Sequence, residues 1–253
     1  MVERLRRDCP WDREQSLETA KTYLLEEAHE AIAALDAGAP EEIRDELGDL
    51  LFQVFFLANM AAERGWFDLS AVADRITRKM IERHPHVFGG SRAETTRQVR
   101  ETWEKRKVKR ESARPLGNLP GTLPALSTAY RMTTRAADLG FDWERDADVA
   151  AKVEEELAEW REAHRSADRK SEEREIGDLL LAVANLARRR GIDPEAALRG
   201  SNARFRERFA GVARRAAESG RAITDFSAAE LDVLWEEEKR EELKGTSDVK
   251  RET

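Results

Sequence analysis

Apolar residues recur at three- and four-residue spacing along most of the chain, a pattern typical of amphipathic helices. In the first part of the chain the pattern predicts helices over about residues 16–36, 41–64 and 69–83, followed by a basic helix over about 94–112. In the second part it predicts helices over about 146–165, 171–190 and 193–216. Asp193 should cap the last of these, with Pro194 at its first helical position.

The stretch ESARPLGNLPGTLPALS, residues 111–127, breaks the helical pattern with three prolines and two glycines. We read it as a linker between two domains. The predicted organisation is an N-terminal domain over 1–112, a linker over 113–127 and a C-terminal domain over 128–253.

Two acidic motifs occur twice in the chain. EEAHE at 26–30 corresponds to EELAE at 155–159, and ELGDLL at 46–51 corresponds to EIGDLL at 175–180. Both pairs are offset by 129 positions (155 − 26 and 175 − 46). Because one offset relates both pairs, we infer a tandem duplication of one helical-bundle domain.

The composition agrees with an all-α fold and argues against nucleic acids and membranes as binding partners. The chain has 253 residues, of which 38% are charged, with only 14 glycines and 7 prolines. A net charge of −7 offers no basic field for a nucleic acid, so we expect no nucleic-acid partner. No apolar run approaches the roughly 18 residues of a membrane span, and Cys9 is the single cysteine. We therefore expect no membrane partner and a cytoplasmic location.

Acidic residues interrupt the apolar patterns at positions that share a helix face. Because a short connection makes neighbouring helices antiparallel, carboxylates from two helices should converge in one groove. The predicted metal ligands are Glu26, Glu27, Glu30, Glu46 and Asp49 in the first copy, and Glu155, Glu156, Glu159, Glu175 and Asp178 in the second.

Converging carboxylates repel one another unless cations neutralise them, and a set of oxygen ligands suits Mg²⁺, with Mn²⁺ as a substitute. The spacing would serve two ions holding a phosphorylated substrate. If only one motif were present, the alternative would be that its glutamates are simply solvated and salt-bridged on the helix surface. The duplication in register favours the metal site.

A series of motifs in order carries a resemblance to a known family. These motifs are CPWD, LLEEAHE, ELGDLLFQV, RHPHVF, GFDW, EEELAE, EIGDLLLAVANLAR and WEEEK. From about residue 4 to about residue 243 the chain resembles the two-domain form of the MazG nucleoside triphosphate pyrophosphohydrolases. The resemblance implies an all-α homodimer built from four-helix bundles. It also implies magnesium-dependent hydrolysis of nucleoside triphosphates to the monophosphate and pyrophosphate, in nucleotide pool sanitation or catabolism.

Basic and aromatic residues at helical spacing are candidates for binding the substrate. The pairs lie four apart, so both members share a face. They are Arg204 with Arg208, Lys79 with Arg83, Trp235 with Lys239, and Trp103 with Lys107. Phe141 and Trp143 of GFDW are expected in the core and outside the site.

Glu156 and Glu159 are the predicted catalytic residues, with Glu156 the first choice to orient a water or accept its proton. The C-terminal copy is expected to be the main catalytic unit. A non-catalytic nucleotide- or metal-binding module remains the alternative. A di-iron enzyme is disfavoured, since Ala158 stands where the first copy has His29.

Overall fold

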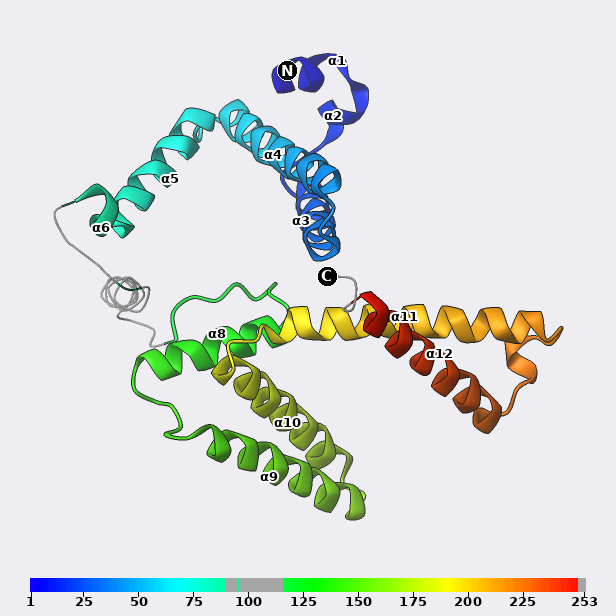
Figure 1. Ribbon diagram of the computed structural model, residues 1–253. Helices are drawn as coiled ribbons and strands as arrows, with labels where there is room; N and C mark the ends of the chain where they lie inside the picture. Colours follow the sequence, from blue (N-terminus) through cyan, green and yellow to red (C-terminus); the bar gives the residue numbers. More distant parts are fainter. Residues whose placement is uncertain (90–94, 96–115, 250–253) are drawn as a thin grey trace. The chain divides into compact units, whose positions relative to one another are not determined.

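A computed structural model describes residues 1–89, 95 and 116–249 (Figure 1). Within these residues every regular element is a helix, as the all-α prediction required. None of the described helices combines the length and the hydrophobicity that a membrane span needs. The predicted basic helix over 94–112, with Trp103 and Lys107, falls outside the described residues except at Thr95.

The chain divides into two compact units, Met1–Trp103 and Glu104–Thr253. The helices of the first are α1 (Val2–Asp8), α2 (Pro10–Glu14), α3 (Ala20–Ala37), α4 (Pro40–Glu63), α5 (Leu69–Arg83) and α6 (Pro85–Phe88). Those of the second are α8 (Ala125–Asp138), α9 (Asp146–Arg165), α10 (Arg169–Arg189), α11 (Pro194–Glu218), the short 3₁₀ helix η1 (Ile223–Asp225) and α12 (Ala228–Val249). Helix α8 begins within the stretch predicted as linker, and the three predicted ranges themselves stay predictions.

In the first unit, α3 and α4 form a helical hairpin. Gly38, at φ 70°, ends α3 in the left-handed conformation that glycine adopts without strain, and Pro40 opens α4. Phe56 and Met60 on α4 pack against Ala20 in the core, and a 2.7 Å ion pair between Arg6 and Glu63 ties α1 to α4. The hairpin therefore holds the EEAHE and ELGDLL motifs face to face.

The second unit repeats this hairpin with α9 and α10. Asp168 caps α10 by accepting hydrogen bonds from the backbone N–H groups of Lys170 and Ser171. Val149 on α9 and Ala184 on α10 are fully buried, and α8 packs against α10. The EELAE and EIGDLL motifs thus face each other as their counterparts do.

Helices α11 and α12 make a second hairpin in this unit. Asp193 caps α11 and Pro194 is at its first turn, as predicted. Glu238 of α12 lies directly over Gly211 of α11, where a Cβ atom would meet its carboxylate at 2.0 Å, and Arg215 donates to that carboxylate at 2.5 Å. A side chain at position 211 would require the Glu238 carboxylate to move away from α11.

Candidate metal centre

Three carboxylates converge between α9 and α10. Glu156 comes from α9, while Glu175 and Asp178 lie three apart on the facing side of α10, and one oxygen of each lies within 4.8 Å of the others. Glu156 and Glu175 are only 5% and 6% exposed. Buried carboxylates at this separation require positive charge nearby, so the group could hold a metal ion.

The equivalent three carboxylates converge in the other unit. Glu27 of α3 meets Glu46 and Asp49 of α4, again with one oxygen of each within 4.8 Å of the others. Each of these positions is 129 residues before its counterpart in the second unit. The two hairpins therefore build one geometry twice.

The remaining predicted ligands lie around these two groups. Glu30 is close enough for its charge to raise the pKa of Glu46, after partial desolvation as the main cause. Partial burial and then the charge of Glu156 raise the pKa of Glu159 in the same way. Glu26 and Glu155 are exposed and belong to neither group of converging oxygens.

In the first unit, the three converging carboxylates repel one another, and no basic side chain of the described residues pairs with them. Partial burial raises the pKa of Glu27, and the charges of Asp49, Glu30 and Glu46 add to it. The amide of Gln53, buried on α4, donates to Glu27 at 3.4 Å and offsets part of this rise. No lysine or arginine nitrogen among the described residues comes within 4.0 Å of Glu27, Glu46 or Asp49.

In the second unit, by contrast, two basic side chains that the sequence patterns did not single out pair with the acidic residues. Lys152, one turn before Glu156 on α9, lies 2.7 Å from Glu156 and 2.8 Å from Glu155, and hydrogen bonds to Glu155 and then Glu156 raise its pKa. Arg174 donates to Glu175 at 2.5 Å. The first unit has Tyr23 and Asp45 at the corresponding positions.

The predicted basic and aromatic residues of α11 and α12 cluster with each other. Arg208 lies 5.7 Å from the ring centre of Trp235 and pairs with Glu242 at 2.6 Å. Arg204 donates to Ser201 at 2.9 Å, and Lys239 to Glu236 at 3.2 Å. In the described structure none of the four forms a hydrogen bond or ion pair with the carboxylates of Glu156, Glu175 or Asp178.

Lys79 and Arg83 lie on α5. Helix α5 follows the C-terminal end of α4, whereas Glu46 and Asp49 lie in the N-terminal half of α4. The α3–α4 hairpin by itself therefore presents the converged acids without the predicted pair of Lys79 and Arg83.

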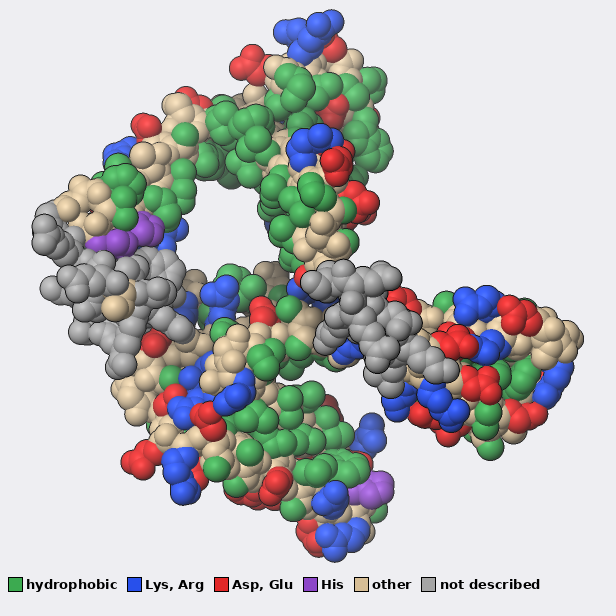
Figure 2. Space-filling model, viewed as in Figure 1, with side chains coloured by type: hydrophobic (Ala, Val, Ile, Leu, Met, Phe, Trp, Pro, Cys, Tyr) green, Lys and Arg blue, Asp and Glu red, His purple; other side chains and the backbone are tan. Residues whose placement is uncertain are grey.

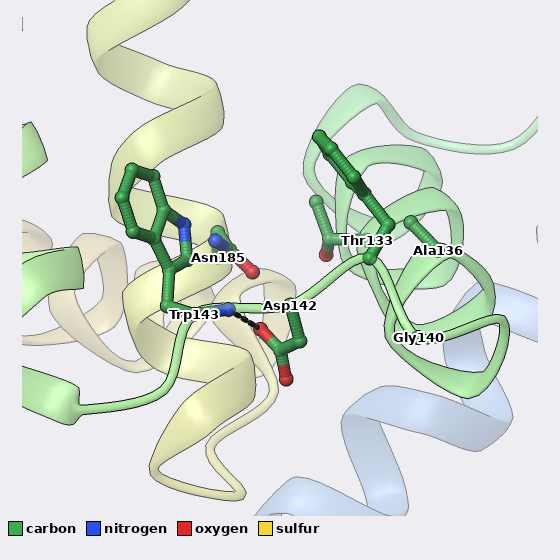
Figure 3. A pocket seen from close by; sticks show the side chains of 7 residues that line it. Thr133, Ala136, Gly140, Asp142, Trp143 and Asn185 are labelled. Carbon is green, nitrogen blue, oxygen red and sulfur yellow. Dashed lines mark hydrogen bonds between the residues drawn. The ribbon is translucent and has the colours of Figure 1, made fainter.

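The GFDW motif lies at the surface and not in the core. Phe141 is 84% exposed and Trp143 43% exposed, so the prediction that they belong to the core was wrong. Gly140, at φ 91°, ends α8 in a left-handed turn closed by a hydrogen bond from the Phe141 N–H to the Ala136 carbonyl. That turn directs the motif outward, where it lines a cavity of about 260 Å³ with Thr133, Ala136 and Asn185 (Figure 3).

Comparison with known proteins agrees with this duplicated architecture. Residues 15–88 match the MazG nucleotide pyrophosphohydrolase domain, and residues 131–204 match phosphoribosyl-ATP pyrophosphohydrolase. The nucleoside triphosphate pyrophosphohydrolase of Escherichia coli K12 is 40% identical over 93% of this chain and 92% of its own length. The nucleoside triphosphate pyrophosphohydrolase/pyrophosphatase MazG of Thermotoga maritima is 39% identical over 94% and 93%.

Fold and site together define a class of protein, namely tandem helical hairpins that each hold a converged group of three carboxylates. The chain belongs to the MazG family, whose domain is a nucleotide pyrophosphohydrolase, and it is thereby a hydrolase. An uncharacterized protein of Bacillus subtilis, YabN, is 37% identical over 92% of this chain but only 49% of its own length.

Proposed function

We propose that the protein is a magnesium-dependent nucleoside triphosphate pyrophosphohydrolase that cleaves between the α- and β-phosphates. One observation carries the proposal: both hairpins bring the same three carboxylates together, although they lie in separate units. The names of the Escherichia coli and Thermotoga maritima relatives support the substrate class. Incubation with Mg²⁺ and each triphosphate tests it, because this cleavage releases monophosphate and pyrophosphate, whereas γ-phosphate cleavage would release diphosphate and phosphate.

The converged residues fit a hard divalent cation. They offer only carboxylate oxygens, the donors that Mg²⁺ and Mn²⁺ prefer over nitrogen or sulfur. Glu156, Glu175 and Asp178 would hold the ion in the second unit, and Glu27, Glu46 and Asp49 in the first. When bound, the ion supplies charge stabilisation at phosphate oxygens and lowers the pKa of water.

The chain's own residues then supply positioning and proton transfer. We assign to Glu156 the orientation of the water that attacks the α-phosphorus and the acceptance of its proton. The raised pKa of Glu159, one turn further along α9, suits it to assist in that role. As the bond from the α-phosphorus to the bridging oxygen breaks, pyrophosphate leaves with the electron pair.

Lys152 and Arg174 balance the site's charge before and during this step. Lys152 holds Glu155 and Glu156 in place, and Arg174 holds Glu175. A triphosphate brings further negative charge to an acidic groove, so a site with two resident cations accepts it more readily. This contrast between the units supports the C-terminal copy as the main catalytic unit.

Arg204, Arg208, Trp235 and Lys239 would enter this site from a second copy of the chain. They lie together on the α11–α12 hairpin, and in the part of the chain that the structure describes they form no hydrogen bond or ion pair with Glu156, Glu175 or Asp178. In a homodimer a partner's hairpin could bring guanidinium and ammonium groups to the departing pyrophosphate. Lys79 and Arg83 would serve the N-terminal copy in the same manner.

Exposed apolar stripes support the homodimer. Hydrophobic side chains gather over the α9–α10 hairpin in Figure 2. Ile176, Leu180 and Val183 form a stripe at helical spacing on α10 and are exposed by 44%, 52% and 43%. The stripe recurs in register on α4 as Leu47, Leu51 and Val54. A hairpin with such a face completes a four-helix bundle by packing against another hairpin.

Leu180→Glu is expected to convert the dimer to a monomer, because it places a charge in the centre of the stripe. Size-exclusion chromatography with light scattering measures the change. The hairpin itself should keep its Tm, since Leu180 is half exposed within one chain. Leu198→Glu, at an exposed leucine of α11 outside the stripe, is the matched control. A wild-type protein that is monomeric at micromolar concentration would contradict the proposed homodimer.

A further inference from the structure

The aromatic cavity beside α8 has no role in the metal chemistry described above. We propose that it binds the nucleobase of the substrate, an inference that rests on the proposed function. Phe141 and Trp143 supply two exposed rings, and Asn185 supplies a planar amide from α10. Figure 3 shows Trp143, Asn185 and Thr133 around one hollow. Its volume of about 260 Å³ lies just below the usual 300–1,000 Å³ range of drug-sized ligand sites and suits a single planar base.

Asn185, which lines the cavity, lies on the same side of α10 as Asp178. Asn185 follows Asp178 by seven residues, which is about two turns, so both side chains leave the helix in nearly the same direction. Their separation along the axis is about 10 Å at 1.5 Å per residue. A base in the cavity and an α-phosphate near the carboxylates could therefore belong to one nucleotide, with the ribose between them.

Lys152 occupies the interval between the two. It lies one turn from Glu156 toward the N-terminal end of α9, and that end meets the C-terminal end of α10, where Arg189 pairs with Asp146 at 2.7 Å. Along the axis of the α9–α10 hairpin, from the carboxylates toward the GFDW loop, anionic ligands are thus followed by a lysine and then by aromatic rings. This order matches the phosphates at the carboxylates, the ribose side of the α-phosphate at Lys152, and the base at the rings.

The loop that carries the rings is held in place. Arg188 and Arg189 pair with Asp142 at 2.5 and 3.2 Å, and Arg189 also donates to the Trp143 carbonyl at 3.0 Å. Although desolvation opposes it, the hydrogen bond from Arg188 lowers the pKa of Asp142, which stays ionised and paired. The backbone that carries the rings therefore needs little ordering when a base enters.

Asn185 is placed to read the base. Its Oδ1 accepts a hydrogen bond from Arg188 at 2.8 Å, which orients the amide. The amide NH₂ group then remains as a donor for a base carbonyl or ring nitrogen. Stacking on the rings tolerates every base, so the amide would contribute the selectivity.

Trp143→Ala is expected to raise the KM for nucleoside triphosphates about tenfold, the order of one lost base–aromatic stack, with kcat changed less than threefold. Phe141→Ala should act in the same direction, and its ring is too exposed for the change to unfold the protein. Asn185→Ala should alter the ranking of ATP, GTP, CTP and UTP. Trp66→Ala, at an exposed tryptophan of the other unit, is the control and should change neither constant.

Adenosine and the other three nucleosides separate this inference from the proposed function, because they carry no phosphate. Quenching of tryptophan fluorescence that is lost in Trp143→Ala and kept in Trp66→Ala supports the cavity even if no triphosphate is hydrolysed. Hydrolysis by the wild type with KM within twofold in both ring variants overturns the base site and leaves the proposed function standing. If no triphosphate is hydrolysed, the absence of quenching with all four nucleosides overturns it too.

Discussion

Glu156→Gln is expected to lower kcat for triphosphate hydrolysis at least a hundredfold, the usual contribution of a positioned proton acceptor. Glutamine keeps the shape of the side chain but cannot accept the proton and is a poor ligand for Mg²⁺. The fold should survive, because Lys152 keeps its 2.8 Å contact with Glu155 and is not left unpaired. Pyrophosphate release and far-UV circular dichroism measure the two effects.

Glu154→Gln is the matched control, since it makes the same chemical change on an exposed position of the same helix, two residues from Glu156. It should leave kcat and KM at their wild-type values. Near wild-type pyrophosphate release by Glu156→Gln would refute the assignment of this residue. Saturable nucleotide binding without product, in the wild type as well, would favour a non-catalytic binding module instead.

The equivalent change in the first unit, Glu27→Gln, should cost less activity. The carboxylates are placed alike in both units, but Tyr23 and Asp45 stand where the second unit has Lys152 and Arg174. The first site can therefore bind a cation but is less suited to a cation together with a triphosphate. A larger loss with Glu27→Gln than with Glu156→Gln would reverse this order of the two copies.

Helix periodicity predicted the elements that carry the acids because apolar residues recur there at three- and four-residue spacing over several turns. The prediction of 41–64 matches α4 at Pro40–Glu63, and that of 146–165 matches α9 at Asp146–Arg165. The convergence of carboxylates followed from spacing and a short hairpin turn alone. Helix α8 was missed because its first residues adjoin a run of prolines and glycines that reads as linker.

The contacts that distinguish the two sites depend on tertiary packing. Which three of five acids converge is set by the depth and rotation of each helix in its hairpin, which spacing leaves open. In the sequence, Lys152 looks like any lysine on the solvated face of a helix. Only its contacts with Glu155 and Glu156 reveal its role. Phe141 and Trp143 read as core residues, yet a left-handed Gly140 turns them outward. The constant offset of 129 positions between the two copies could have revealed this difference, because it aligns Lys152 with the uncharged Tyr23.

Addition of Mg²⁺ at neutral pH is expected to raise the Tm by several degrees, and the gain should shrink as the pH falls toward the ordinary glutamate pKa of about 4.3. The folded-state pKa values of Glu27, Glu46 and Glu159 are raised above their unfolded values. Such groups stabilise the fold below the unfolded pKa, and that stability is lost as the pH rises through the folded pKa. Without metal, the protein should therefore lose stability on going from acid to neutral pH at these sites.

Glu46→Gln sharpens this prediction, because removing one converging charge should raise the metal-free Tm at neutral pH while reducing the gain from Mg²⁺. Glu230→Gln is a control of opposite sign. Hydrogen bonds from Arg221 and then Ser227 lower the pKa of Glu230 to about 2, so its contribution is present at neutral pH and is lost as the pH falls. That variant should lower the Tm at neutral pH with or without Mg²⁺. Differential scanning calorimetry measures the wild type and both variants with and without Mg²⁺. A wild-type Tm that Mg²⁺ leaves unchanged at every pH would count against a metal at either group of carboxylates.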